Sequence, residues 1–551
     1  MSAPSRLKHE SSLGEAVAQR PEGSPFGAPG RPKHESSLGE AVAQRPEGSS
    51  MNARPAVAST RSKRSFDVGA EHRPRRRSFF ATLRGLFVPG PRARFVLPGL
   101  AALMTACATA PVQPPLLPEL PAAYRQAGPW RLADPALAAS GPATWGLLGD
   151  TRLDRWLAEL DAGNLGVAQA EARYRQARAL ADRSRAALWP RLDAGASLSR
   201  GANDGANAAS RYVADLTLAW TPDLWGKASG ETDAAGADAR AQAAARAGVR
   251  LLAEAEFTRQ YLRIRVLDEQ AAMLRLTEEA YERSLALTRN QYEAGLVARS
   301  DVALAEAQLA SVRVQLAEQT STRATLEHAL AVLLGRLPGD FALEPGAPVP
   351  ASPRIPAGVP SSLLERRPDV VQAEQTVAAA NARLGVARAA WFPDLTLGAT
   401  GGLQSATLGQ WLSAPAWVWS LGPALAAMLL DGGARSAEQA RALAVYDETA
   451  AAYRQTVLVA IREVEDALAA LATLDIVIAG QRQVVALAVE AEAMIRNQYA
   501  AGMVSFLDVA VAQNSTLAAR RDLLDRIGAR LDATVALIAA TGGGWRQDEA
   551  P

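Results

Sequence analysis

Hydrophobic residues recur along the second half of this chain at the spacings of packed α-helices. One series alternates four and three positions apart: Val457, Ile461, Val464, Leu468 and Leu471. A second series recurs every seven positions: Leu517, Leu524, Leu531 and Ile538. Both spacings are typical of coiled coils, in which an apolar stripe on each helix packs against a neighbouring helix.

The helical segments are unusually long. Helix-forming residues run from 226 to about 290 and then to about 334, and they run again from 434 to about 499 and from about 504 to 541. A helix of roughly 65 residues spans about 100 Å, because each residue adds about 1.5 Å. Helices of this length need partners of similar length, so we expect them to pack against one another.

The same sequence occurs at the two places where these helices are interrupted. RNQYEAGLVARSDVALA at 289–305 and RNQYAAGMVSFLDVAVA at 496–512 share 11 of 17 residues at an offset of 207. Gly295 and Gly502 break the helices there, and glycine accepts the positive φ of a tight turn. Each half of the chain therefore predicts a shorter helix (164–188 or 369–390), strands, a long helix, a tip and a second long helix.

Strands are predicted between the shorter and the longer helix of each half. In the first half, apolar residues alternate with other residues: Tyr212, Ala214, Leu216, Leu218 and Trp220. In the second half the alternation returns at Trp417, Trp419 and Leu421, and 193–200 and 394–401 are weaker candidates. An apolar face with aromatic ends is typical of a membrane strand, although a soluble sheet can show it too. Four strands cannot close a barrel, whereas three copies supply twelve.

Composition and motifs give little support for an enzyme. The 551 residues are 48% apolar and 5% aromatic, with a formal charge of +2, so the charge gives no reason to expect a nucleic-acid partner. A single cysteine excludes an internal disulfide and a thiol-rich metal site. The sequence has no phosphate-binding loop and no zinc or nucleophile motif. We predict no catalytic residue, no metal and no cofactor.

The first part of the chain has a different character. KHESSLGEAVAQRPEGS stands at 8–24 and again at 33–49, and basic clusters follow at 61–64 and 73–77. We expect residues 1–90 to form a disordered basic leader, with a misassigned start as the alternative.

RARFVLPGLAALMTAC at 92–107 resembles a bacterial lipoprotein signal. The resemblance implies a signal peptide over 91–106 and a lipidated Cys107, and the alternative is an ordinary buried cysteine. Met104 stands where leucine is usual, and Ala108 favours the outer membrane.

These patterns predict the boundaries of the mature chain. We expect a lipidated Pro-rich segment at 107–150, a first repeat at 151–340, a linker at 341–361, a second repeat at 362–545 and a tail at 546–551. Ser362 to Glu365 has the spacing of a capping box.

Several longer motifs occur in a fixed order. They are AWTPDLWGK (219–227), ERRPDVVQAE (365–374), NARLGVARAAWFPDLTL (381–397), LLDGGARSAEQA (429–440), REVEDALAAL (462–471) and GGGW (542–545). Over roughly 107–545 the chain resembles the outer-membrane efflux factors, the TolC-like channels, and among them the lipidated NodT-type branch.

The resemblance implies an α+β membrane protein that is built as a homotrimer. Each chain would give four strands to an outer-membrane β-barrel and two hairpins to a long α-helical coiled-coil barrel. Such a channel is lipid-anchored and performs no chemistry. It passively exports small molecules together with a periplasmic adaptor and an inner-membrane pump, here of the RND type. A type I protein secretion channel is the alternative within this fold, and a lipid-anchored coiled-coil scaffold is an alternative of another class.

Two acidic residues stand just past the tips, Asp301 and Asp508. Helix capping or interaction with the helix dipole explains them without a pore. The resemblance implies in addition that Asp508 lies near a constriction, as one acid of a cation-favouring ring of three. It also implies that Asp301 and Tyr499 hydrogen bond to hold the tips shut.

The chain departs from the family pattern at the gate. Val504 stands where an arginine can occur, and Val511 where a second aspartate can. The closed state would then depend more on apolar contact through Leu507 and Val511. The tips, with Gly295, Gly502, Val297 and Val504, resemble the place where an adaptor docks.

Overall fold

The computed structural model describes residues 125, 145–202, 208–346, 349–350, 353, 366–413 and 416–545. All of them belong to one compact unit, Pro89–Pro551. The predictions for the leader, the signal peptide, Cys107, the capping box at 362–365 and the tail fall outside the described residues.

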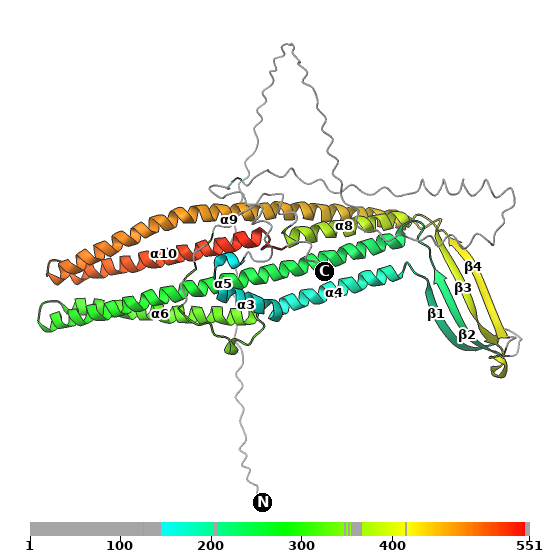
Figure 1. Ribbon diagram of the computed structural model, residues 1–551, viewed down its shortest axis with the longest axis horizontal. Helices are drawn as coiled ribbons and strands as arrows, with labels where there is room; N and C mark the ends of the chain where they lie inside the picture. Colours follow the sequence, from blue (N-terminus) through cyan, green and yellow to red (C-terminus); the bar gives the residue numbers. More distant parts are fainter. Residues whose placement is uncertain are drawn as a thin grey trace, which may run out of the picture. The chain divides into compact units, whose positions relative to one another are not determined.

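The described chain consists of long helices and one sheet (Figure 1). A short 3-10 helix, η2 (Trp145–Leu148), precedes the first repeat. The first repeat contains α3 (Thr151–Gly163), α4 (Leu165–Ala186), β1 (Arg191–Gly201), β2 (Ala209–Trp220), α5 (Lys227–Glu293), α6 (Arg299–Leu333) and η3 (Pro338–Asp340). The second contains α8 (Pro368–Ala389), β3 (Asp394–Ser405), η5 (Leu408–Gln410), β4 (Trp417–Ala426), α9 (Ala434–Ala500) and α10 (Phe506–Ala540). All predicted helices and strands are confirmed within a few residues, and α3 is an addition.

The two repeats match in length as well as in order. Helices α5 and α9 each have 67 residues, and α6 and α10 each have 35. Helix α5 packs against α6, α9 packs against α10, and α5 also contacts α10, which places the two hairpins side by side. Figure 1 shows both tips at the end opposite the strands.

The shorter helices extend this arrangement toward the sheet. Helix α4 packs against α5, α5 against α8, and α8 against α9, so these four form a row with α4 and α9 at its ends. The strands follow in the order β1-β2-β3-β4, each antiparallel to the next. The pairing of β2 with β3 joins the two repeats. Strands β1 and β4 are the two edges of the sheet.

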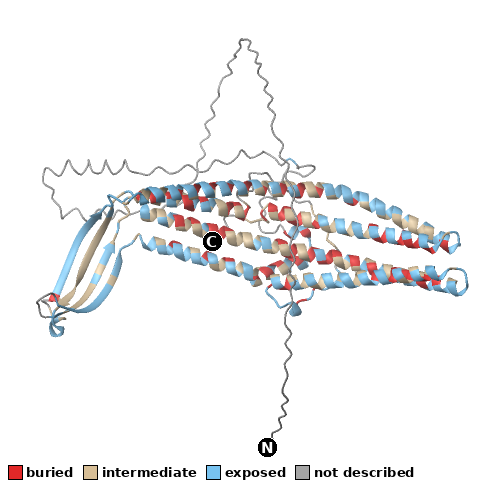
Figure 2. Cartoon of the chain, turned by 180° about the vertical axis from the view of Figure 1, so that it is seen from behind, coloured by how far each residue is buried: buried red, intermediate tan, exposed pale blue. Residues whose placement is uncertain are grey.

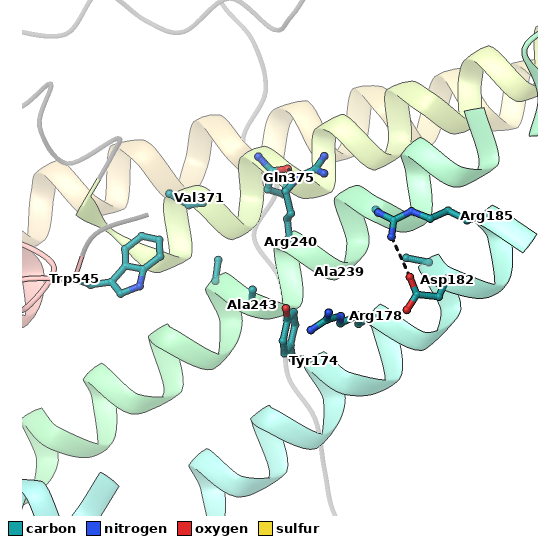
Figure 3. A pocket seen from close by; sticks show the side chains of 13 residues that line it. Tyr174, Arg178, Asp182, Arg185, Ala239, Arg240, Ala243, Val371, Gln375 and Trp545 are labelled. Atoms are coloured by element: carbon teal, nitrogen blue, oxygen red, sulfur yellow. Dashed lines mark hydrogen bonds and ion pairs between the residues drawn. The ribbon is translucent and has the colours of Figure 1, made fainter. Parts of the chain in front are cut away.

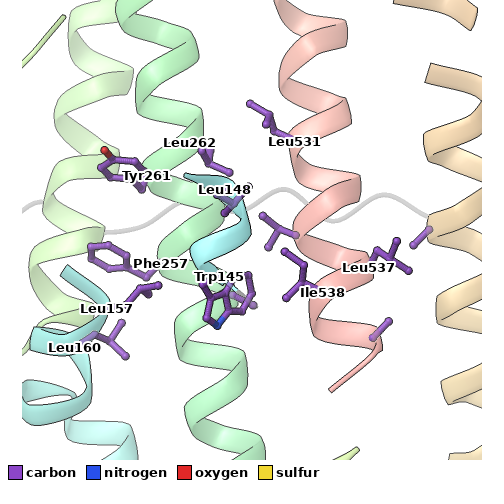
Figure 4. Packing of buried hydrophobic residues seen from close by; sticks show 14 of the residues in the cluster. Trp145, Leu148, Leu157, Leu160, Phe257, Tyr261, Leu262, Leu531, Leu537 and Ile538 are labelled. Carbon is purple, nitrogen blue, oxygen red and sulfur yellow. The ribbon is translucent and has the colours of Figure 1, made fainter. Parts of the chain in front are cut away.

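Apolar side chains from several elements meet where the hairpins begin (Figure 4). Residues of η2 and α3 cover α5, and α10 approaches from the other side. The labelled members are Trp145, Leu148, Leu157, Leu160, Phe257, Tyr261, Leu262, Leu531, Leu537 and Ile538. Phe257 and Tyr261 are fully buried, and burial of such large aromatic groups is a major source of core stability.

A buried charge network lies beside this core. Arg265 is 1% exposed, and its guanidinium donates to the carbonyl oxygen of Glu344 at 2.8 Å and to the Tyr261 hydroxyl at 3.2 Å. It lies 3.4 Å from Asp268, whose other oxygen accepts from Arg323 at 2.6 Å. A buried cation needs such partners, because removing it from water is costly. The network fixes the chain around 344 against α5 and α6.

Both hairpins end in the same close contact. Gly335 follows α6 with a φ of 72°, and Gly542 follows α10 with a φ of 93°. A Cβ on Gly335 would lie 2.3 Å from the carbonyl oxygen of Gly163, and one on Gly542 would lie 2.0 Å from that of Arg366. Only glycine allows this backbone approach. The contact ties the end of each hairpin to the start of the shorter helix.

Polar side chains reinforce the same two contacts. The Asn164 amide donates to the carbonyl oxygen of Leu333 at 2.7 Å, and its oxygen caps α4 by accepting from the Val167 amide at 3.0 Å. In the second repeat the Arg367 guanidinium donates to the carbonyl oxygen of Ala540 at 3.2 Å. Leu333 and Ala540 are the last residues of α6 and α10. Two different residues thus satisfy equivalent carbonyl groups that the helices leave free.

Within the described ranges, no helix has both the length and the apolar character needed to cross a membrane.

Candidate functional site

Each tip is a tight turn closed by the same hydrogen bonds. In the first, the amide of Gly295 donates to the carbonyl oxygen of Tyr292 at 2.9 Å, and that of Leu296 to Gln291 at 2.8 Å. In the second, Gly502 and Met503 repeat both bonds, each at 2.9 Å. This is the Schellman motif, which needs a left-handed residue. Gly295 and Gly502 have φ values of 74° and 72°, as the sequence predicted.

The two tips share one apolar cluster. Its buried members are Leu274, Tyr281, Leu285, Val302, Ala305, Leu309, Val312, Tyr499, Phe506, Val509, Ala510 and Leu517. They come from α5, α6, α9 and α10. The two hairpins are therefore packed together near their tips and are not independent arms.

The repeated residues of the two tips have different environments. Tyr499 is 6% exposed and contacts the ring of Phe506 edge-on, with ring centres 5.6 Å apart. Its counterpart Tyr292 is 45% exposed. The second hairpin inserts its tyrosine into the cluster, whereas the first directs its tyrosine to the surface.

The Tyr499 hydroxyl links the two hairpins. It donates to the side-chain oxygen of Gln291 at 2.6 Å and lies 3.5 Å from the Thr288 hydroxyl. The expected hydrogen bond between Tyr499 and Asp301 is not found among the described residues, because the Tyr499 hydroxyl donates its one hydrogen to Gln291 instead. Sequence reasoning missed Gln291, since Gln498 repeats it in the other tip and nothing in the sequence distinguishes the two.

A second polar contact crosses between the hairpins. The Gln308 amide donates to the carbonyl oxygen of Ala510 at 3.1 Å, in a buried environment. A buried hydrogen bond of this kind contributes about 1 kcal/mol net, but leaving its partner unpaired costs about 1–3 kcal/mol. This bond therefore favours one register between α6 and α10.

Asp508 caps helix α10. Its carboxylate accepts from the backbone amide of Ser505 at 3.0 Å and from the Ser505 hydroxyl at 2.7 Å. The Ser505 side chain in turn accepts from the amide of Asp508, which completes a capping box. The hydrogen bond from the Ser505 side chain holds the pKa of the Asp508 carboxyl below its ordinary value.

The neighbours of Asp508 differ from those of its counterpart. Leu507 and Val511 are exposed beside Asp508 on α10. Asp301 lies in the first turn of α6, whose N-cap residue Ala298 makes no side-chain hydrogen bond. The capping interpretation therefore describes Asp508 well. No hydrogen bond or ion pair of the Asp301 side chain is found among the described residues, and its charge lies in the first turn of α6, where the helix dipole favours it.

The lowered pKa of Asp508 predicts a pH dependence. A carboxylate with a lowered folded-state pKa stabilises the fold above its unfolded-state pKa, and this contribution disappears as pH falls through the folded-state pKa. We expect Asp508→Ala to lower the melting temperature at pH 7, with the difference from wild type shrinking below about pH 4. Thermal melts followed by circular dichroism at several pH values measure this. A difference that grows on acidification would contradict it.

The predicted docking residues lie at the surface of both tips. Val297 and Val504 are half-buried, and Leu296 and Met503 between them and the glycines are exposed. Each tip thus presents a small apolar surface next to a glycine turn, in the same arrangement twice.

The sheet has one apolar and one polar face. Residues directly opposite in an antiparallel pair lie on the same face. The pairing register places these apolar residues and glycine on one face: Leu192, Ala194, Ala196 and Leu198 of β1, Tyr212, Ala214, Leu216, Leu218 and Trp220 of β2, Leu395, Leu397, Ala399, Gly401 and Leu403 of β3, and Trp417, Trp419, Leu421, Pro423 and Leu425 of β4. Three polar residues, Arg200, Ser210 and Ser405, lie on the same face at the end of the sheet farthest from the helices. The opposite face carries Asp193, Asp215, Thr217, Thr396, Thr400, Gln404 and Ser420, among others.

The aromatic residues of the apolar face have distinct surroundings. The indole of Trp220 donates to the carbonyl oxygen of Leu188 at 3.1 Å, at the helix end of the sheet. Tyr212 lies toward the far end, 6.5 Å from the ring of Trp411. Trp417 and Trp419 are exposed on the edge strand β4. Figure 2 shows that much of the sheet surface is exposed in the single chain.

A groove runs along α4, α5 and α8 and reaches Trp545 (Figure 3). Arg240 donates to the side-chain oxygen of Gln375 at 2.7 Å, and Arg185 pairs with Asp182 at 3.0 Å. The lining of this groove includes no Ser, Thr, Cys or His. Across the part of the chain that the structure describes, no three His, Cys, Asp or Glu side chains are grouped so as to hold a metal ion.

Known proteins are similar to this chain in sequence and in structure. The family model described as outer membrane efflux protein matches residues 156–336 and 359–543. A probable efflux pump outer membrane protein of Pseudomonas putida, TtgC, is 31% identical over 341 residues, covering 61% of this chain and 70% of that protein. The pyoverdine export outer membrane protein OpmQ of Pseudomonas aeruginosa is 32% identical over 422 residues, covering 73% and 88%.

A solved structure also resembles this chain. The outer-membrane channel OprN matches with a TM-score of 0.74 and 26% identity, over 80% of this chain and all of that one. The paired hairpins, the four-stranded sheet and the family model that matches both halves of the chain lead to one conclusion. This chain belongs to the outer membrane efflux protein family and has the fold of the TolC-like outer-membrane channels.

Proposed function

We propose that three copies of this chain form a passive channel that exports small molecules across the outer membrane. A periplasmic adaptor and an inner-membrane pump, of the RND type, would deliver the molecules. The two faces of the sheet carry this proposal. Between Trp220 and Tyr212 one face is apolar, mainly Leu, Ala and Trp residues, which suits lipid, and the other carries Asp, Thr and Ser residues, which suits a water-filled interior.

The edges of the sheet support the three-fold assembly. In lipid every backbone amide and carbonyl must be paired within the protein, so a sheet with two free edges is not a stable membrane structure. Strand β1 leads away from the helices and β4 leads back toward them, so β4 of one copy can pair antiparallel with β1 of the next. Three four-stranded sheets would then close as a barrel of twelve strands.

In this assembly the tips would close the periplasmic end. Three Asp508 carboxylates around the axis would favour cations, and the exposed Leu507 and Val511 would narrow the opening by apolar contact. The bond from Tyr499 to Gln291 would hold each second hairpin against the first. Val297 and Val504 would lie where the adaptor docks.

The remaining assignments concern the anchor and the chemistry. Cys107, at the end of the segment that resembles a lipoprotein signal, would carry the lipid that anchors the chain in the outer membrane. Transport would need no catalysis and no cofactor in this chain, since the pump supplies the energy. The named relatives export pyoverdine or belong to efflux pumps, which favours small-molecule export over type I protein secretion. A lipid-anchored coiled-coil scaffold would not explain the exposed apolar face of the sheet.

Planar-bilayer conductance of the purified protein tests the proposal. We expect discrete currents that prefer cations, and we expect Asp508→Asn to bring the cation-to-anion permeability ratio close to one. Asp522→Asn is the matched control, because it removes the same charge from an exposed site four turns further along α10. It should change the ratio far less.

The outcomes separate the parts of the proposal. Currents with unchanged selectivity in Asp508→Asn would keep the channel and reject the acid ring. If the protein is a folded monomer and gives no currents, the channel hypothesis is rejected and the coiled-coil scaffold becomes the better explanation.

A further inference from the structure

The groove along α4, α5 and α8 is large enough to hold a segment of polypeptide. Its volume is about 440 Å³, which falls in the range of ligand-binding clefts, roughly 300–1,000 Å³. Small residues form much of its lining, and all of them are buried or half-buried: Ala181, Gly236, Ala239, Ala243 and Ala244. Side chains of this size allow the backbone of another segment to come close to the helices.

The charges in this groove favour an acidic occupant. Its charged lining residues are three arginines and one aspartate, and the aspartate, Asp182, pairs with Arg185 at 3.0 Å. Arg240 donates to the neutral side chain of Gln375 at 2.7 Å. No hydrogen bond or ion pair of the Arg178 side chain is found among the described residues. Two cations therefore face the groove without a carboxylate partner in the part of the chain that the structure describes.

The chain that leaves α10 is directed into this groove. Gly542, Gly543 and Gly544 have φ values of 93°, 60° and 89°, and a Cβ on Gly543 would lie 2.2 Å from the Leu251 side chain on α5. Trp545 then lines the groove together with Ala244. Ala244 precedes Leu251 by seven residues, or roughly 10.5 Å along α5, and α5 begins beside the sheet. The chain at Trp545 is therefore heading along the groove toward the sheet.

The residues after Trp545 carry the complementary charge. Residues 546–551 read RQDEAP, so Asp548 and Glu549 come three and four positions after Trp545. An extended chain spans at most about 3.3–3.6 Å per residue, so these two residues reach roughly 10 and 13 Å from Trp545. Arg240 lies four residues, or about 6 Å, beyond Ala244 along α5. Figure 3 shows Trp545 at one end of the groove, Arg185 at the other, and Arg178 and Arg240 between them.

A second groove meets Trp545 on the side from which the chain arrives, and its charge is of the opposite sign. Its charged lining residues are three acids and two arginines, and Gly542–Gly544 already form part of its wall. Both arginines are paired, Arg246 with Glu171 at 2.5 Å and Arg250 with Glu254 at 2.9 Å. Electrostatics therefore favour the first groove over the second for a segment that contains two adjacent acids.

We propose that residues 546–551 dock in the groove along α4, α5 and α8, where Asp548 and Glu549 pair with Arg178 and Arg240. The docked segment connects the end of α10, in the second repeat, to α4 of the first repeat. Each ion pair at such an exposed site is weak. Because the segment is tethered at Trp545, however, its effective concentration at the groove is in the millimolar range, and weak contacts are sufficient. The inference does not depend on the proposed channel, since every residue involved belongs to one chain.

Carbodiimide cross-linking of the folded, detergent-purified full chain tests this docking. The reagent joins a carboxylate directly to a lysine amine in contact with it. Arg178→Lys keeps the positive charge and places an amine in the groove. Arg173→Lys is the matched control, because Arg173 is exposed on the same helix, five residues or roughly 140° around it, and does not line the groove. Peptide mass spectrometry measures the links from Asp548 or Glu549 to the introduced lysine.

We expect at least about tenfold more of these links in Arg178→Lys than in Arg173→Lys. The excess should fall severalfold in 1 M NaCl, because salt screens exposed charges. Equal links in the two variants, or none in either, would overturn the docking. Links that join two chains, seen as dimers on a denaturing gel, would overturn docking within one chain and assign the groove to the same segment of a second copy.

Proteolysis provides a second measurement that needs no cross-linker. Trypsin cleaves after Arg546, and docking should slow that cleavage. Arg178→Glu with Arg240→Glu should repel the segment and raise the rate at least about fivefold. Arg173→Glu with Arg275→Glu makes the same charge change at exposed positions of α4 and α5 outside the groove, and it should leave the rate unchanged. Circular dichroism first establishes that both variants are folded at the temperature used. The same rate in both variants would overturn the proposed ion pairs.

Discussion

Replacing Arg265 by alanine should lower the free energy of unfolding by about 3–5 kcal/mol, which is the usual cost of breaking a buried ion pair. The substitution removes the donor to the Glu344 carbonyl oxygen and the Tyr261 hydroxyl, and it takes a cation away from Asp268. It also leaves a cavity, since Arg265 is among the largest fully buried side chains. The segment around 344 would lose its attachment to α5.

Thermal or denaturant melts of the detergent-purified protein measure this loss. Arg275→Ala is the control, because Arg275 is exposed on the same helix, and we expect a change of about 0.5 kcal/mol or less. Arg265→Lys keeps the charge but loses the forked donor geometry, so it should fall between the two. A melt of Arg265→Ala equal to that of the control would show that the network adds nothing to stability.

Gly335→Ala should cost about 3 kcal/mol. A left-handed backbone costs a residue with a Cβ roughly 1–2 kcal/mol, and the new Cβ would also lie 2.3 Å from the Gly163 carbonyl oxygen. That neighbour is backbone and cannot rotate away, so α6 must shift against the start of α4.

Gly339→Ala provides the comparison for this change. No atom lies within 4 Å of where its Cβ would be, and Gly339 is not among the positive-φ glycines. It should melt close to wild type, whereas Gly542→Ala, at the equivalent contact of the second repeat, should behave like Gly335→Ala. Equal tolerance of Gly335→Ala and Gly339→Ala would mean that the close contact is readily relaxed.

Much of this fold can be predicted from spacing alone. Long apolar periodicities, each interrupted by one glycine, are sufficient to locate both hairpins, because the hydrophobic stripe and the turn residue are local features. The alternating residues of β2 identify a strand for the same reason. Strand β1 gives a weaker signal, since small and polar residues occupy many of its positions.

The candidate site was only partly predictable. Tyr292 and Tyr499 stand in identical RNQY segments, yet one is exposed and the other buried, because the difference arises from the packing of two distant hairpins. The same holds for Gln291, whose role depends on Tyr499 being close to it. Arg265 escaped notice because a charged residue in a long helix usually faces water. Asp508 as a capping residue was predictable, since its partner Ser505 lies three positions away.

The matched lengths of the two hairpins restrict how this chain can change. Helices α6 and α10 each have 35 residues between the glycine contact at one end and the tip at the other. The number of residues in each helix therefore sets how far its tip lies from that contact. A deletion of seven residues from one of them, with its partner helix, would withdraw that tip by roughly 10 Å while the other stayed in place. Insertions and deletions in the hairpins therefore keep the two tips level only when both repeats of the chain change by the same number of residues. Single substitutions are free of this constraint, so the duplicated halves can diverge in side chains while their lengths stay the same.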